Sequence, residues 1–71
     1  MSFSTDIKRI RTGLMLSQTE FGKLLGVNYQ TVTRWEKGTS KPNYKAQQSI
    51  SSLCQEKGIS FDVTKSLKDE T

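Results

Sequence analysis

The side chains best suited to specific polar contacts are concentrated in one short stretch of the chain. Amide, hydroxyl, phenol and guanidinium groups occupy one face of an expected helix over residues 29–37 and the position just before it, and they can reach the base edges or phosphates of a nucleic acid. The set is Asn28, Tyr29, Gln30, Thr33 and Arg34. Val32 and Trp35 lie three residues apart on the opposite face and are spaced for burial. The stretch therefore predicts a helix with one buried side and one polar side.

The residue types that enzymes and metal sites need are scarce. The chain of 71 residues contains no histidine and one cysteine, Cys54. Histidine is the commonest general base and the commonest metal ligand, and a single cysteine cannot form an internal disulfide. No nucleophile has a partnered base, and no pair of acids is apparent. We therefore expect no enzyme, no metal site, no cofactor and no small-molecule ligand.

The positive charge of the chain lies in its first two-thirds. The net charge is +4; residues 1–45 hold eight Lys and Arg against three Asp and Glu, whereas residues 46–71 hold three against four. A basic face attracts phosphates and releases their counterions, which favours a polyanionic partner. The alternative is the solvated surface of a mildly basic soluble protein.

Targeting and membrane signals are not found in the sequence. The first six residues turn polar at once, and no apolar run approaches the roughly 20 residues that span a bilayer. A lone cysteine fits a reducing compartment. We expect a cytoplasmic protein without a membrane partner.

Four short helices are expected, ending near residues 13, 25, 37 and 57. Each begins after a residue whose short side-chain oxygen can accept a hydrogen bond from a free backbone amide. Glu20 lies three residues after the second of these caps, which makes a capping box. The expected caps are, in chain order, Ser4 or Thr5, Ser17, Asn28 and Asn43.

The second and third helices are expected to cross steeply through a tight turn. Gly22 supplies the small residue where the helices approach, and Gly26 can adopt the unusual backbone angles of the turn. We expect Cys54 to be buried and Met15 to fill a gap between helices. The expected core is Ile10, Leu14, Phe21, Leu25, Val27, Val32, Trp35, Ile50 and Leu53.

The segment after Gly58 has two interpretations. Ile59, Phe61 and Val63 alternate with polar residues, which favours an extended segment that helps to pair two copies of the chain. Alternatively, Ser60 caps a short fifth helix. We prefer the extended form and divide the chain into a helical domain at 1–58 and a tail at 59–71 that serves dimerisation.

The helical part resembles the phage-repressor family, the Cro and lambda-repressor-like helix-turn-helix regulators. The resemblance covers roughly residues 5–58 and rests on three short matches: Leu16 to Gln18, Trp35 to Gly38, and Lys41 with Pro42. It implies an all-α fold of four or five packed helices, with the helix-turn-helix formed by the second and third. In this family the third helix enters the DNA major groove, and dimers bind half-sites about 34 Å apart. Residues 59–67 are the poorest match.

The resemblance also implies roles for individual residues. It pairs Arg11 with Glu36 in a structural salt bridge between the first and third helices. Base contacts are implied for Tyr29, Gln30, Thr33 and Arg34. DNA backbone contacts are implied for Gln18, Asn28, Thr31, Lys37, Thr39, Ser40, Lys41 and Asn43.

The leading hypothesis is a sequence-specific transcriptional regulator, a repressor that binds double-stranded DNA as a homodimer on a palindromic operator. Small phage regulators of the Cro type, restriction controllers and some antitoxins are similar in size. The alternative is a protein-interaction module on the same scaffold, such as an anti-repressor or an antitoxin. The polar and basic face of the third helix argues against that alternative.

Overall fold

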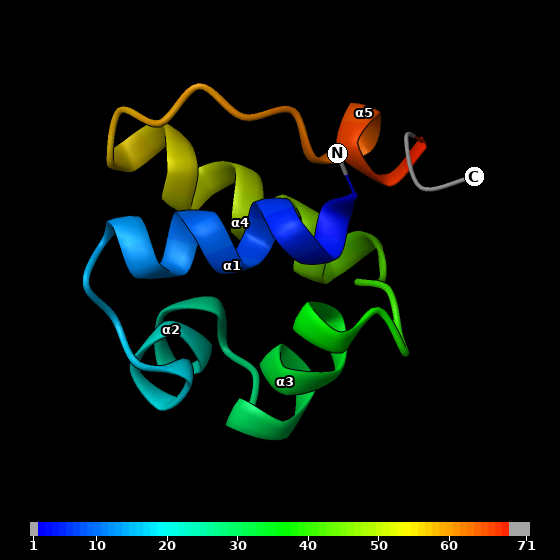
Figure 1. Ribbon diagram of the computed structural model, residues 1–71. Coiled ribbons are helices and arrows are strands. Elements are labelled where there is room, and N and C mark those ends of the chain that lie inside the picture. The colour runs from blue at the N-terminus through cyan, green and yellow to red at the C-terminus, as the bar shows by residue number, and fades with distance from the viewer. Residues whose placement is uncertain (1, 69–71) are drawn as a thin grey trace.

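The computed structural model describes residues 2–68 and is all-helical over that range. Its helices are α1 (Phe3–Gly13), α2 (Gln18–Leu25), α3 (Tyr29–Lys37), α4 (Tyr44–Glu56) and α5 (Val63–Lys68). Figure 1 shows α1 across the middle of the molecule, with α2 and α3 below it and α4 and α5 above. This arrangement confirms the predicted all-α helix-turn-helix fold and decides the uncertain helix count in favour of five within the described residues.

The helix starts follow the capping residues closely. Ser17 forms the predicted capping box: its Oγ accepts from the Glu20 amide at 3.0 Å, and its own amide donates to Glu20 Oε1 at 2.9 Å. Hydrogen bonds from Ser17 lower the pKa of the Glu20 carboxyl. Asn28 and Asn43 cap α3 and α4 through their side-chain oxygens. Only α1 begins earlier than expected, because Ser2 caps it instead of Ser4 or Thr5.

The approach of α2 to the turn requires glycine at position 22. A Cβ built on Gly22 would lie 2.6 Å from the carbonyl oxygen of Val27, which is well inside van der Waals contact. The Val27 amide also donates to the Gly22 carbonyl at 2.8 Å, so the turn is tied to this point of the helix. Gly26 has a φ of 77°, in the left-handed region that glycine adopts without strain. Both predicted roles of these glycines are confirmed.

The core is formed by side chains from all five helices, and Trp35 of α3 is among its most deeply buried members. The Trp35 ring is 2% exposed and meets Phe3 edge-on, with 6.3 Å between ring centroids. Leu14 and Val27, both expected in the core, are half-buried at its edge. The other expected core residues are buried: Ile10, Phe21, Leu25, Val32, Trp35, Ile50 and Leu53. Phe3, Ile7, Ala46 and Val63 are buried as well, and Cys54 is buried as expected. Burial raises the pKa of the Cys54 thiol.

The prediction of an extended segment after Gly58 is wrong. Residues 59–62 have no regular structure, and Val63 begins α5, capped by Asp62, whose Oδ1 accepts from the Lys65 amide at 3.1 Å. The alternation predicted a strand because Ile59, Phe61 and Val63 all turn towards the core, although the first two do so from a loop. Ser66 donates to Asp6 Oδ2 at 2.7 Å, which joins α5 to α1. The last three residues of the predicted tail, 69–71, lie outside the described residues.

Met15 does not fill a gap between helices. It is 90% exposed and has a φ of 60°, because it occupies the left-handed position that ends α1. The Met15 amide donates to Thr12 O and the Leu16 amide to Arg11 O, the paired hydrogen bonds of a Schellman motif. Glycine usually holds this position, so the sequence contained no signal for the turn at residue 15.

Candidate nucleic-acid interface

The third helix is presented at one edge of the molecule by the two helices beside it. Figure 1 shows α2 and α3 joined by a short turn below α1. Val32 and Trp35 anchor α3 to the core, since they are 0% and 2% exposed. The opposite side of α3 packs against no other described helix. The helix is therefore held along one side and open to a partner along the other.

The open side of α3 carries the predicted base-contacting groups. Tyr29 is 52% exposed, and Gln30, Arg34 and Lys37 are exposed as well. Thr33 is half-buried, one turn after Tyr29. Glu36 is the only acid in α3, and its side chain is 6% exposed. The surface that α3 offers is therefore polar and positively charged.

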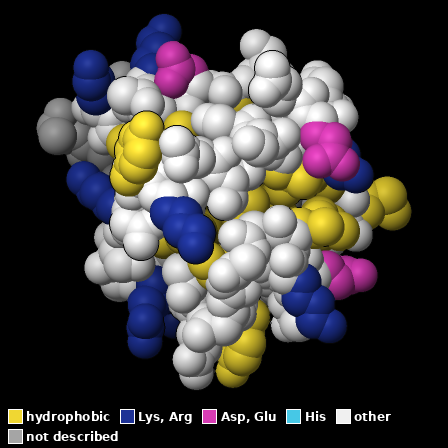
Figure 2. Space-filling model, turned by 180° about the vertical axis from the view of Figure 1, so that it is seen from behind, with side chains coloured by type: hydrophobic (Ala, Val, Ile, Leu, Met, Phe, Trp, Pro, Cys, Tyr) yellow, Lys and Arg dark blue, Asp and Glu magenta, His cyan; other side chains and the backbone are white. Residues whose placement is uncertain are grey.

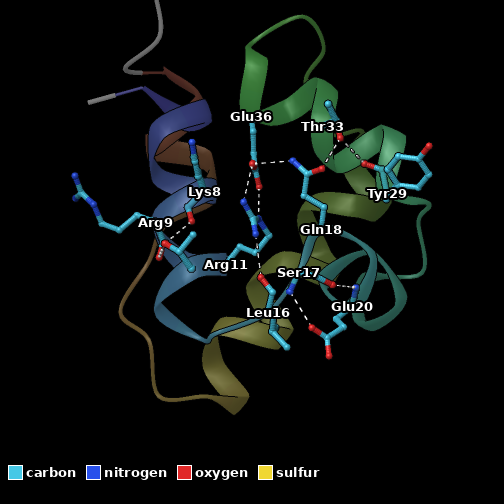
Figure 3. A network of polar contacts seen from close by, with 11 residues as sticks. Lys8, Arg9, Arg11, Leu16, Ser17, Gln18, Glu20, Tyr29, Thr33 and Glu36 are labelled. Atoms are coloured by element: carbon cyan, nitrogen blue, oxygen red, sulfur yellow. Dashed lines mark hydrogen bonds and ion pairs between the residues drawn. The ribbon is translucent and has the colours of Figure 1, made fainter.

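A network of hydrogen bonds fastens α3 to α1 and α2. Arg11 Nε donates to Glu36 Oε2 at 2.6 Å and Nη2 donates to Glu36 Oε1 at 3.1 Å, so the pair is bidentate. Arg11 Nη1 also donates to the Leu16 carbonyl at 2.9 Å. Figure 3 shows these contacts between α1 and the C-terminal end of α3. The implied Arg11–Glu36 salt bridge is present and nearly removed from solvent, at 13% and 6% exposure.

Gln18 extends this network to the middle of α3. Its Nε2 donates to Glu36 Oε1 at 3.1 Å, and its Oε1 accepts from Thr33 Oγ1 at 2.8 Å. Figure 3 shows Gln18 reaching from the start of α2 towards both residues. Of its amide, one N–H is left to donate to a phosphate. Gln18 therefore braces the recognition surface whether or not it also touches DNA.

The loop after α3 brings most of the remaining backbone-contact candidates together. A surface hollow of about 460 Å³ is lined by Thr31, Ser40, Lys41 and Asn43, along with Trp35 and neighbouring residues. Lys37 and Thr39 do not line this hollow; both are exposed, and the Thr39 hydroxyl donates to the Arg34 carbonyl.

Two of the backbone-contact candidates have structural duties in the protein. The Asn28 side chain caps α3 and accepts from the amide and the hydroxyl of Thr31, at 2.9 and 3.1 Å. The Asn43 side chain caps α4. A phosphate contact by either residue would therefore use its remaining side-chain N–H groups or the backbone.

Basic side chains are also spread over the far side of the molecule. Figure 2 shows Lys and Arg side chains in both the upper and the lower half of this face, with hydrophobic side chains between them. No group of three or more potential metal ligands occurs among the described residues. Over the same residues no helix is long and apolar enough to cross a membrane.

Sequence reasoning did not identify the partners in the two hydrogen bonds by which Gln18 holds the surface in place. The first is the Thr33 to Gln18 hydrogen bond, and the second is the Gln18 to Glu36 bond. The spacing of Gln18, Thr33 and Glu36 gave no local signal. Gln18 lies on α2 and the other two lie on α3, so their contact depends on how the two helices cross. Their shared polarity at one helix crossing was the only available clue.

Comparison with known proteins agrees with this geometry. A family model described as helix-turn-helix matches residues 7–61, which covers α1 from Ile7 onward, all of α2 to α4 and most of the loop that follows. Searches of curated proteins and of solved structures gave no significant match. The matched region contains the turn at Gly26, the braced α3 and the loop with Lys41. The chain therefore belongs to the XRE-type helix-turn-helix family of Cro and lambda-repressor-like DNA-binding regulators.

Proposed function

We propose that the protein is a sequence-specific transcriptional repressor that binds a palindromic operator as a homodimer. The observation that carries the proposal is that α3 is fixed to the protein along one side and exposed along the other. Its inner side is fixed by the Arg11, Glu36 and Gln18 network, while its outer side presents polar and basic groups and no exposed acid. A rigid helix of this kind fits the major groove, where side chains distinguish base pairs by their hydrogen-bonding edges.

Individual bases are read by the exposed groups of α3. Gln30 can pair with adenine through two hydrogen bonds, and Arg34 with guanine O6 and N7. Tyr29, half exposed at the start of the helix, lies where it can stack on a sugar or touch a thymine methyl group. Thr33 lies between these residues and is the shortest of the four side chains.

Residues on both sides of α3 contact the DNA backbone. On one side Gln18, at the start of α2, donates its remaining amide hydrogen to a phosphate. On the other stand Lys37, Lys41 and the loop hydroxyls around the hollow. Such contacts strengthen binding and set the position of the helix without choosing a sequence.

The short length of α3 supports binding as a pair. Nine residues extend roughly 13 Å at 1.5 Å each, which is about four base pairs at 3.4 Å per step. A site of four base pairs recurs far too often in a genome for useful regulation. Two copies on adjacent half-sites double the sequence that is read. Repression would follow from occlusion of the promoter by the bound pair.

Selection of bound sequences from a random duplex pool tests the proposal. We expect an enriched palindrome whose half-sites are centred about one helical turn apart. Binding to the enriched duplex should weaken steeply between about 50 and 200 mM salt, with a log–log slope near −0.9 for each phosphate contacted. Enrichment of a single half-site, with strict monomer in sedimentation, would remove the homodimer. Failure to bind any duplex at low salt would favour the protein-interaction alternative.

A further inference from the structure

We infer that Thr33 reads DNA with its methyl group, and that it selects the 5-methyl group of a pyrimidine at one position of each half-site. This inference rests on the proposed DNA-binding function and specifies one contact within it. It follows from the directions of two hydrogen bonds, from Gln18 to Glu36 and from Thr33 to Gln18.

The Glu36 carboxylate sets the orientation of the Gln18 amide. A carboxylate paired with a guanidinium accepts hydrogen bonds and has none to donate. Glu36 Oε1 lies 3.1 Å from the Gln18 side chain, so Gln18 must turn its NH₂ group towards it. The Gln18 oxygen then faces the other way, 2.8 Å from Thr33 Oγ1. The Arg11–Glu36 pair thereby decides which end of the amide meets α3.

The Thr33 hydroxyl consequently keeps its hydrogen inside the protein. The hydroxyl has a single hydrogen, and both protein neighbours of its oxygen are carbonyl acceptors. These are Gln18 Oε1 at 2.8 Å and the Tyr29 backbone oxygen at 3.0 Å. Figure 3 shows the hydroxyl turned towards Gln18. Donation to a base acceptor, such as guanine O6 or thymine O4, would leave the Gln18 oxygen without this partner.

The methyl group is the part of the Thr33 side chain that is not used by these hydrogen bonds. Position 33 lies on α3 between exposed Tyr29 and exposed Arg34, one turn along the face proposed to meet the bases. The pyrimidine 5-methyl group is the apolar feature of the major groove, and threonine methyl groups are among its contacts. The short side chain leaves room for a base to approach the helix closely.

The experiment uses the full chain and the duplex enriched by selection. Each thymine is replaced in turn by deoxyuridine, which removes only the methyl group. For the unmodified protein we expect about fourfold weaker binding at one thymine per half-site, the effect of one buried carbon. Duplexes with cytosine or 5-methylcytosine at that position test the methyl group apart from the rest of the thymine base. The protein should bind the duplex with 5-methylcytosine more tightly than the duplex with cytosine.

Two variants assign the effect to the correct atom. Thr33→Ser keeps the hydroxyl and loses the methyl group, so it should bind the thymine and uracil duplexes equally. Thr33→Val keeps a methyl group and loses the hydroxyl, so it should retain the fourfold preference while binding both duplexes more weakly. Circular dichroism establishes that both variants are folded.

The outcomes separate the two proposals. Specific binding that is indifferent to every thymine methyl group overturns the role of Thr33 and leaves the DNA-binding function standing. The role of the Thr33 methyl group is likewise overturned if Thr33→Ser keeps the preference and Thr33→Val loses it, since the hydroxyl would then be the reading group. Absence of binding to any duplex overturns the proposed function and this inference together.

Discussion

Replacing Gly22 by alanine tests the close crossing of α2 with the turn. The new Cβ would lie 2.6 Å from Val27 O, so the oxygen must withdraw by 0.4 Å to reach even the 3.0 Å that real Cβ atoms respect. The obstacle is backbone, which cannot rotate away. Overpacking costs about 1–3 kcal/mol, and a rigid neighbour places this case near 3. Alanine regains about 1 kcal/mol of helix propensity, so we expect a net loss of about 2 kcal/mol.

That loss is large for a chain of this size. At about 0.05–0.15 kcal/mol per residue, the total stability is roughly 4–10 kcal/mol. The midpoint of thermal unfolding should fall by about 8–16 °C. Urea unfolding followed by circular dichroism gives the free energy directly, provided that the slope against urea is unchanged.

Gly13→Ala is the matched control. It lies at the end of α1, has no positive φ, and an added Cβ would meet nothing within 4 Å. The substitution should stabilise the protein by about 0.5–1 kcal/mol through reduced freedom of the unfolded chain. If Gly22→Ala is as stable as the natural protein, or gains as much as the control, the close approach of α2 to the turn does not require glycine.

Three further perturbations test other parts of the molecule. Glu36→Gln leaves the nearly buried Arg11 guanidinium without an anion and should cost about 3–5 kcal/mol in urea unfolding; a loss below about 1 kcal/mol would contradict the structural role of the pair. Arg34→Ala should relax base preference at one operator position by about 1–3 kcal/mol, whereas Lys41→Ala should weaken binding on all sequences and reduce the salt slope by about 1; equal losses on every duplex would refute this division. Glu20→Gln tests the capping box by its pH dependence. The pKa of Glu20 is lowered in the folded protein, so its carboxylate stabilises the fold above the ordinary value of 4.5 and ceases to do so as the pH falls through the lower folded value. The stability difference between the natural protein and Glu20→Gln should therefore shrink on acidification, and a difference independent of pH would show that the carboxylate is not the source.

Most of the helical framework could be predicted because its signals are local. The caps at Ser17, Asn28 and Asn43 act on amides three residues away, so sequence spacing alone reveals them. The same holds for the left-handed turn at Gly26. The start of α1 was misplaced by two or three residues, since Ser2, Ser4 and Thr5 all offer hydroxyls and only packing selects among them.

The tail shows where local signals fail. Alternating apolar residues over 59–63 match a strand, yet Val63 is buried as the first residue of α5. The periodicity of a sequence indicates which side chains face the core. It does not indicate whether the backbone that carries them is a loop or a strand. The choice depended on the surface already formed by α1 and α4, to which Asp6 contributes the acceptor for Ser66.

The sequence by itself determined the four main helices, the helix-turn-helix register and the polar face of α3. These features depend on residues a few positions apart, where backbone geometry fixes the neighbours. Only the tertiary structure decided the direction of the Gln18 amide, the inward hydroxyl of Thr33 and the docking of α5. Those contacts join residues 15, 18 and 60 positions apart, and each polar group had several partners of equal chemistry along the chain. Packing selected one partner for each, because a nearly buried polar group must be satisfied where it comes to rest.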